Sequence, residues 1–300
     1  YVRYYLHRGG NALPDPFRFE FEWKYATNEF SNTKMSGYGN GSNLDDTTTQ
    51  LDTIKQISHR TKNRIVPMET RSIPEYQQKY LDVLFNTVLD KSYPVMLKSL
   101  LKLNTPPVLS MVGNVNLLSK KKIGFSGSRK VSEKGIDVTR DCVEQLSRDT
   151  NVCIVSGYAQ GVDKEAHYAA LQSGGSTIVV LPNGISSFYV SAELKDVLDW
   201  NRVLVISEYL PKDKWTISRA MNRNNTIIGL SDSMVVVEAG VTGGSLDAGL
   251  RTLEDRKPLF VPMYADYPES ALGNRLLLDK GAKGIGRNRQ SNRANVAALL

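Results

Sequence analysis

Histidine and cysteine, which supply many metal ligands and catalytic groups, are scarce in this sequence. It has two cysteines, Cys142 and Cys153, and three histidines among 300 residues. Two cysteines are too few for a disulfide framework and lack the spacing of metal ligands, so we expect buried free thiols in a reducing cytoplasm. We therefore predict neither a metal site nor a disulfide-stabilised fold.

One histidine has a chemically suggestive neighbour. His167 follows Asp163 by four residues, which places both side chains on one face of a helix. Such a pair can bind a metal, or the aspartate can orient a catalytic base. More often the aspartate stabilises a first helical turn and the histidine packs beneath a neighbouring loop, and we favour this second interpretation.

Long hydrophobic runs are also missing. No apolar run approaches the roughly 18 residues of a membrane-spanning helix, and the first residues do not have the pattern of a secretory signal. The hydrophobic fraction of 41% and the charged fraction of 23% are typical of a soluble globular chain. We therefore predict a cytoplasmic protein without a membrane partner.

Acidic residues do not balance the basic ones. The chain has 38 Lys and Arg against 31 Asp and Glu, a formal net charge of +7, and a pI near 9.2. An excess of cations favours an anionic partner such as a nucleic acid, but charge alone does not identify one.

The chain divides into zones of different character. Residues 1–50 contain the alternating segment FRFEFEWKY, which predicts a half-buried strand, and then the polar run 31–50, which predicts a linker. Residues 51–104 have apolar residues at helical spacing, which predicts a small helical region that Pro94 interrupts. Strand–helix alternation occupies 105–290, and 291–300 form a predicted C-terminal tail.

The alternating zone predicts an α/β fold. Its apolar runs are short, continuous and rich in β-branched residues, as in strands that are covered on both faces. With helical segments between them, they predict a doubly wound, mostly parallel sheet of the extended Rossmann-like type. The predicted strands are 121–127, 152–157, 176–184, 202–208, 233–240 and 258–263, and the predicted helices are 135–149, 163–174, 193–200, 219–231 and 245–256.

Glycine and hydroxyl residues follow several of the predicted strands. In an open α/β sheet, ligands bind in the crevice beyond the carboxyl ends of the strands. Backbone N–H groups in such turns suit a phosphate. The sequence has neither the G-x-G-x-x-G fingerprint of dinucleotide enzymes nor the Lys-Ser/Thr ending of a P-loop, so we predict no cofactor.

Arginine and asparagine side chains complete the predicted crevice. Arg129 closes the first glycine turn, and Arg223 is followed by two asparagines in a helical segment. These side chains are common contacts to nucleic-acid phosphates and base edges. The predicted nucleic-acid-binding residues are Gly127, Ser128, Arg129, Lys130, Ser156, Gly157, Arg223, Asn224, Asn225, Gly243, Gly244 and Ser245.

An ordered set of short motifs extends from about residue 93 to residue 283. They are Tyr93-Pro94, Pro106-Pro107-Val108-Leu109, Gly113-Asn114, Gly127-Ser128-Arg129, Ser156-Gly157-x-Ala159-x-Gly161-Val162-Asp163-x-x-Ala166-His167, Ile227-Ile228-Gly229-Leu230-Ser231, Gly244-Ser245-Leu246 and Gly273-Asn274-Arg275-Leu276. The set resembles the DNA-processing protein A family (DprA/Smf). The resemblance implies a Rossmann-like fold that binds single-stranded DNA without base-specific readout. It also implies a homodimer that loads a RecA-type recombinase during natural transformation and recombination.

The resemblance assigns roles to two segments and shows two departures. In that family the glycine-turn arginine and a helix-start R-N-R line the DNA pocket, which implies the same for 127–129 and 223–225. Asn225 stands where the family has its second arginine, and Tyr189-Val190-Ser191 stands in place of a Y-P-K-like segment. The residues after 290 are too few for the winged-helix domain that some members carry.

Two alternatives to DNA binding use the same crevice. A nucleotide-sensing Rossmann-like domain needs only the crevice itself. A phosphoribohydrolase of the lysine-decarboxylase-like (LOG) type needs the glutamate of P-G-G-x-G-T-x-x-E, which residues 241–248 lack. Glu208 and Glu238 end predicted strands and could polarise a water, but such carboxylates more often accept hydrogen bonds from loops. We therefore predict no catalytic residue and no enzyme.

Overall fold

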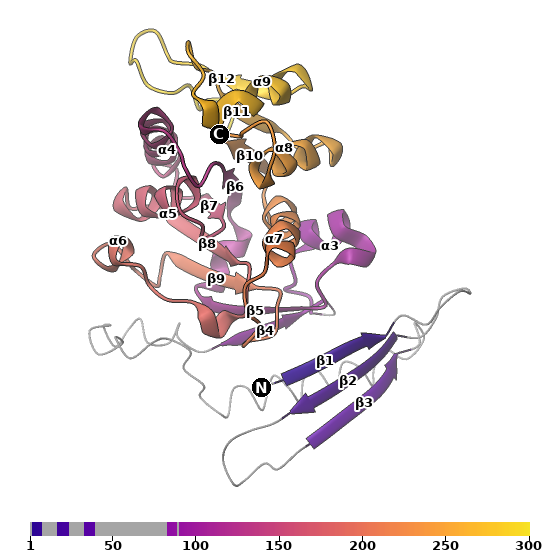
Figure 1. The fold of residues 1–300 in the computed structure, drawn as a ribbon. Helices are drawn as coiled ribbons and strands as arrows, with labels where there is room; N and C mark the ends of the chain where they lie inside the picture. Colours follow the sequence, from indigo (N-terminus) through magenta and orange to yellow (C-terminus); the bar gives the residue numbers. More distant parts are fainter. Residues whose placement is uncertain (1, 8–16, 24–32, 40–82, 89) are drawn as a thin grey trace.

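A separate antiparallel sheet forms near the N-terminus of the computed structural model (Figure 1). It contains β1 (Val2–His7), β2 (Phe17–Trp23) and β3 (Thr33–Gly39) in that order. β2 confirms the strand predicted from the alternating segment, whereas β3 shows that the linker prediction was wrong over these residues, because the segment pairs with β2 along its length. The structure describes residues 2–7, 17–23, 33–39, 83–88 and 90–300, so the rest of the predicted linker lies outside it.

The remaining strands form one nine-stranded sheet. They are β4 (Leu84–Thr87), β5 (Val108–Gly113), β6 (Lys121–Ser126), β7 (Val152–Ser156), β8 (Ser176–Leu181), β9 (Val203–Ser207), β10 (Ser233–Val236), β11 (Leu259–Pro262) and β12 (Lys283–Ile285). The spatial order is β12-β11-β10-β6-β7-β8-β9-β5-β4. Pairing is parallel from β12 to β9 and antiparallel where β5 and β4 join, which confirms a mostly parallel, doubly wound sheet.

Helices cover both faces of this sheet (Figure 1). Side chains alternate along β7, so Ile154 packs with Val143 on one face, while Val155 packs with Ile227 on the other. Both faces are therefore buried, as the continuous apolar runs predicted. The first face carries α4 (Glu133–Leu146) and α5 (Val162–Gln172), and the second carries α3 (Val95–Leu101), α7 (Ile217–Leu230), α8 (Gly244–Glu254) and α9 (Leu272–Asp279).

Two helical predictions were wrong. Residues 84–87, which fall within the predicted helical zone 51–104, form β4, because pairing with β5 satisfies their backbone groups. The predicted helix 193–200 is shortened to α6 (Ala192–Lys195), since Asp199 accepts hydrogen bonds from Asn201 and Arg202 and turns the chain toward β9. Residues 51–82 and 89 lie outside the described part. Short 3-10 helices are η2 (Lys102–Asn104), η3 (Val115–Ser119), η4 (Ile185–Ser187) and η5 (Glu269–Ala271).

The predicted C-terminal tail, residues 291–300, is part of the α/β unit. Val296 and Leu299 are buried in the core on the α4 side of the sheet. The Gln145 side chain donates to the carbonyl of Ala294 at 2.9 Å, and Arg293 pairs with Asp141 at 2.5 Å. The unit therefore extends from β4 to the last described residue, and the expected boundaries at 105 and 291 fall inside it.

The cysteines are free thiols, as predicted. Cys142 and Cys153 are both buried, and burial raises the pKa of each thiol to about 12. Neither thiol is therefore a reactive thiolate at neutral pH.

Across the described residues, no helix is both long and apolar enough to cross a membrane.

The fully buried Asn274 should be a major source of stability. Its Oδ1 accepts from the Ala239 N–H and its Nδ2 donates to the Val237 carbonyl, both at 2.9 Å, which ties α9 to the chain after β10. We expect Asn274→Ala to lower the free energy of unfolding by about 2–4 kcal/mol in urea denaturation, because both backbone groups lose a buried partner. The exposed Asn222→Ala is the control and should change it by less than about 0.5 kcal/mol. Equal effects would contradict this role.

Candidate functional site

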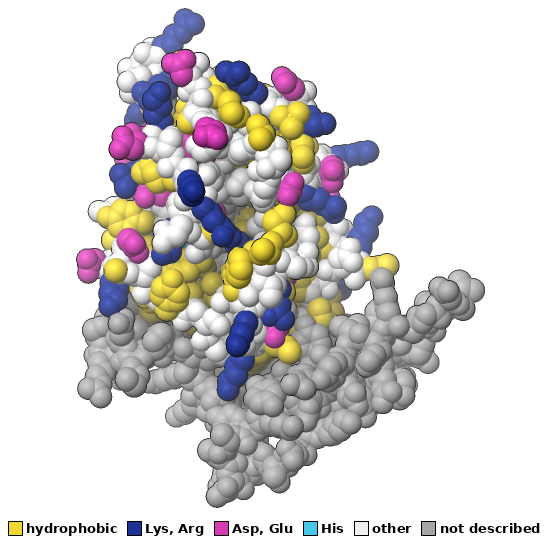
Figure 2. Space-filling model, in the orientation of Figure 1, with side chains coloured by type: hydrophobic (Ala, Val, Ile, Leu, Met, Phe, Trp, Pro, Cys, Tyr) yellow, Lys and Arg dark blue, Asp and Glu magenta, His cyan; other side chains and the backbone are white. Residues whose placement is uncertain are grey.

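The turns that follow β6, β7 and β10 meet α7 and α8 at the carboxyl edge of the sheet, as the sequence predicted. Together they enclose a cavity of about 530 Å³. Figure 2 shows that the surface of the α/β unit carries Lys and Arg side chains with hydrophobic ones between them. The predicted residues that line the cavity are Gly127, Ser128, Arg129, Arg223, Asn224, Gly243, Gly244 and Ser245.

A second cavity of about 240 Å³ adjoins the first. Arg129 and Trp215 line both cavities, and the Arg129 guanidinium lies 5.9 Å from the centre of the Trp215 ring. A guanidinium at that distance is attracted to the ring face. This pair therefore lies where the two cavities, or chambers, of the cleft meet. The exposed Tyr189 lines the smaller chamber.

Glycines allow the turns to approach one another closely. A Cβ on Gly161 would collide with the Ser128 carbonyl, and the residue has φ of +81°, which favours glycine. A Cβ on Gly127 would lie 2.5 Å from the Val162 side chain at the start of α5. The loops after β6 and β7 therefore pack backbone against backbone, which leaves their N–H groups near the cavity.

The first turn of α8 borders the larger cavity. Gly243, the N-cap residue, has φ of +106° and makes no side-chain cap, so the first N–H groups of α8 have no capping side chain. Gly243, Gly244 and Ser245 line the cavity there. An uncapped helix N-terminus with its dipole is well suited to an anion.

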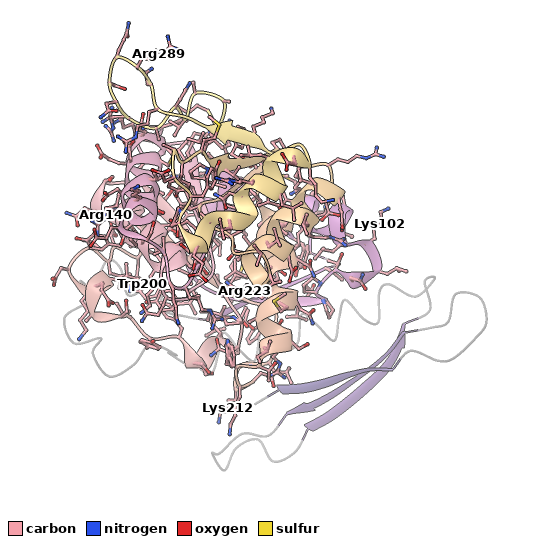
Figure 3. The ribbon with its side chains drawn as sticks, turned by 45° about the horizontal axis from the view of Figure 1, so that its top comes forward. Lys102, Arg140, Trp200, Lys212, Arg223 and Arg289 are labelled. Atoms are coloured by element: carbon pink, nitrogen blue, oxygen red, sulfur yellow. The ribbon has the colours of Figure 1, made fainter. Side chains whose placement is uncertain are left out.

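Arg223 is a buried charge at the floor of both cavities (Figure 3). It is 4% exposed, and its Nη1 donates to the Val180 carbonyl at 2.9 Å. Its buried Nε has no partner among the described residues. Burial lowers the pKa of Arg223 and raises that of Asp163, while their opposite charges oppose both shifts. A Cβ on Gly157 would collide with both groups, so glycine is required beneath them.

His167 is structural, in agreement with the favoured interpretation. It is fully buried, with Nδ1 2.7 Å from the Thr177 hydroxyl and Nε2 hydrogen-bonded to the Gly157 carbonyl. Because a carbonyl only accepts, Nε2 carries a proton, and the Thr177 hydroxyl that contacts Nδ1 also lies 3.0 Å from the Ile154 carbonyl. Among the residues that the structure describes, no cluster of His, Cys, Asp and Glu could hold a metal. Burial lowers the pKa of His167 to about 4.

Of the two strand-end glutamates, Glu238 accepts a hydrogen bond from a loop N–H, as the sequence favoured, whereas Glu208 accepts one from a side chain of helix α7. Glu238 is fully buried and accepts from the Ser132 N–H at 3.0 Å and from the Ser270 hydroxyl at 2.6 Å. Glu208 accepts from the Thr226 hydroxyl. The hydrogen bonds of these carboxylates therefore stabilise the walls of the cavity.

Four predicted site residues lie outside the cavity linings. Lys130 is exposed, and Asn225 is half-buried and lines neither cavity. Ser156 is buried, and its hydroxyl donates to the Phe125 carbonyl at 2.7 Å. Gly157 lies beneath Arg223 and Asp163. These last two residues shape the site from below rather than contacting its contents.

Sequence reasoning missed the apolar rim of the cleft. Trp215, Ile217 and Met221 line the larger cavity and are 46%, 72% and 37% exposed. They come from the segment before α7 and from its first turns. An aromatic residue directly after two lysines in a polar loop, as in PKDKWTIS, is the signal that could have found them, since bases stack on such side chains.

Fold and cleft together define a Rossmann-like α/β protein with a cleft of arginines, glycines and a helix N-terminus at its carboxyl edge. The family model for DNA recombination-mediator protein A matches residues 84–294. The chain belongs to this family. It is 34% identical over 199 residues to the DNA processing protein DprA of Streptococcus pneumoniae, covering 66% of this chain and 69% of that protein. It is 30% identical over 242 residues to DprA of Bacillus subtilis, covering 79% and 80%.

Solved structures of family members have the same fold. DprA of Streptococcus pneumoniae aligns with a TM-score of 0.62 and 32% identity over 69% of this chain and 72% of that one. DNA processing protein A of Helicobacter pylori aligns with a TM-score of 0.57 and 27% identity over 67% of this chain and 90% of that one. The latter structure is described as giving insight into a unique single-stranded DNA binding mode.

The buried histidine predicts a pH dependence of stability. In the unfolded chain its pKa returns to 6.5, so between about pH 6.5 and 4 the unfolded state binds a proton that the folded state does not. The free energy of unfolding should therefore fall as the pH is lowered through this window, by on the order of 3 kcal/mol from His167 alone. In urea denaturation at several pH values, the free energy of unfolding of His167→Gln should depend less steeply on pH than that of wild type. If the two proteins show the same pH dependence, His167 is not the group responsible.

Proposed function

We propose that the cleft binds single-stranded DNA without reading its sequence, and that the bound strand is then passed to a RecA-type recombinase. The observation that carries the proposal is the Arg129–Trp215 pair, where a cation and an exposed ring border two adjoining chambers. Membership of the recombination-mediator family supports both DNA as the ligand and a recombinase as the partner.

The backbone of the strand is held by charge and by N–H groups. Arg129 is exposed at the chamber boundary and can pair with a phosphate, and the uncapped start of α8 offers N–H donors a short way along the cavity. Arg223 adds a fixed positive charge below, with one N–H still unpartnered. None of these groups reads a base, so binding tolerates any sequence.

The bases are held by stacking on the apolar rim. Trp215 offers an exposed ring face, and Ile217 and Met221 extend the apolar surface along α7. Stacking on an aromatic ring accepts all four bases, because each base has a π face. The cleft therefore combines the two elements of sequence-tolerant strand binding.

The two departures from the family pattern leave this cleft intact. Asn225 lines neither cavity, so its replacement of an arginine removes no charge from the linings. Ser191 is 5% exposed and its N–H donates to the Tyr158 hydroxyl at 3.1 Å, so it supports the wall of the smaller chamber. Both strand-end glutamates are hydrogen-bonded to hydroxyl groups of the walls, which supports a binding protein rather than an enzyme. A homodimer is proposed from family membership.

Arg129→Ala is the direct test of backbone binding. We expect weaker binding of single-stranded DNA in gel-shift and anisotropy titrations, with the slope of log affinity against log salt reduced by about 0.7, because one phosphate contact is lost. Wild type should bind single strands more tightly than duplexes. Lys102→Ala, a change at an exposed cation that lines neither cavity, should leave both measurements unchanged.

Salt-independent binding, or unchanged affinity in Arg129→Ala, would reject the proposal. If a free nucleotide displaced the bound strand as effectively as an oligonucleotide does, the cleft would instead belong to a nucleotide-sensing domain. Release of a base from a nucleoside monophosphate would identify the phosphoribohydrolase alternative.

Trp215→Ala tests the stacking contribution. We expect it to weaken single-strand binding by about 1–3 kcal/mol while leaving the salt slope unchanged, since no charge is removed. Trp215→Phe keeps an aromatic face and should retain most of the affinity. Because Trp215 is 46% exposed, thermal melting of both variants should match wild type. Equal loss in the two variants would contradict stacking.

A further inference from the structure

A basic hairpin follows β12, outside the cleft. Residues 286–294 turn back on themselves, with Arg287 and Ala294 paired in a β-bridge at the base. The Asn288 N–H donates to the Arg293 carbonyl at 2.7 Å, and its side-chain oxygen accepts from the N–H groups of Gln290 and Ser291 at 2.9 and 3.1 Å. Hydrogen bonds within the hairpin therefore fix the conformation of its turn. Figure 3 shows Arg289 at the tip.

Positive charge in this segment is not balanced locally. From Lys280 to Leu300 the sequence has five Lys and Arg residues and neither Asp nor Glu. One of the five, Arg293, is neutralised by Asp141 at 2.5 Å and Glu144 at 2.9 Å, both on α4. The hairpin is thereby fixed to the α/β unit through an arginine that is no longer available to a ligand.

The two other hairpin arginines remain available. Arg287 is exposed and, among the described residues, donates only to the uncharged side chain of Asn292, at 3.3 Å. Arg289 is exposed, and no carboxylate of the described residues pairs with it. An arginine pair on a fixed turn, flanked by Asn, Gln and Ser side chains, suits a phosphate backbone, because each guanidinium can donate two parallel hydrogen bonds to phosphate oxygens.

The base of the hairpin lies near the strands that border the cleft. It begins at the carboxyl end of β12, two strand positions from β10, which is roughly 10 Å. The hairpin is anchored on α4 through Asp141. This helix starts at Glu133, just after the glycine turn, and Asp141 lies about 12 Å along it. Exposed Lys130 and Lys134 lie near the beginning of this same helix.

We propose that the hairpin is a second DNA contact, where Arg287 and Arg289 hold the phosphate backbone of the strand outside the cleft. The inference takes DNA as the ligand from the proposed function, but it does not depend on the cleft being the binding site. The hairpin lengthens the bound segment of the strand by phosphate contacts alone, without any base readout.

The test compares four full-length proteins by anisotropy, with labelled single strands of about 6 and about 30 nucleotides over a range of salt. They are wild type, Arg129→Ala, the hairpin variant Arg287→Ser/Arg289→Ser, and the charge-matched control Lys91→Ser/Lys102→Ser, whose lysines are exposed. We expect the hairpin variant to lose affinity for the long strand, with the salt slope reduced by about 1.4, because two phosphate contacts disappear. Its affinity for the short strand should change less, and its melting temperature should match wild type.

The outcomes separate this inference from the proposed function. If Arg129→Ala has no effect but the hairpin variant still lowers the slope, the cleft proposal fails and the hairpin contact stands. If the hairpin variant binds the long strand as wild type does, the hairpin contact is wrong, whatever Arg129→Ala shows. An equal loss in the lysine control would also overturn it, because the effect would then reflect net charge alone.

Discussion

The buried guanidinium of Arg223 is the interaction on which the site depends. It joins three elements, because it projects from α7, donates to a carbonyl of β8, and lies with Asp163 of α5 over Gly157. Taking a charge out of water is unfavourable unless opposite charge and hydrogen bonds compensate it, so these partners must stay in place together. The floor of the cleft is therefore fixed before any ligand arrives, and a phosphate entering it meets donors that need no rearrangement.

Periodicity and turn chemistry predicted most of the fold and much of the site. Continuous apolar runs identified the parallel strands, because burial on both faces leaves no polar alternation. The rule that ligands bind at the carboxyl edge then placed residues as distant in sequence as Ser128 and Gly244 around one cavity, which the structure confirmed. The family resemblance was also confirmed by the family model and by the relatives.

What the sequence did not predict depended on contacts between distant segments. The helical spacing around residues 84–87 could not show that β5 would offer a pairing edge. The residues after 290 resembled a tail because their apolar side chains show no helical or strand periodicity, and only the fold places them in the core on the α4 side. Trp215 was missed because a single aromatic residue has no periodicity, and only the fold brings its ring to Arg129.

The close backbone packing at the carboxyl edge separates the positions that build the cleft from those that contact its contents. Gly157 and Gly161 carry no side chain to offer a ligand, yet any added carbon there collides with a charged group or a carbonyl. Trp215 and Ile217 face the cavity but support little of the fold, since both are exposed. The cleft can therefore exchange its rim residues, and with them the chemistry of its opening, while the glycines beneath keep its shape constant.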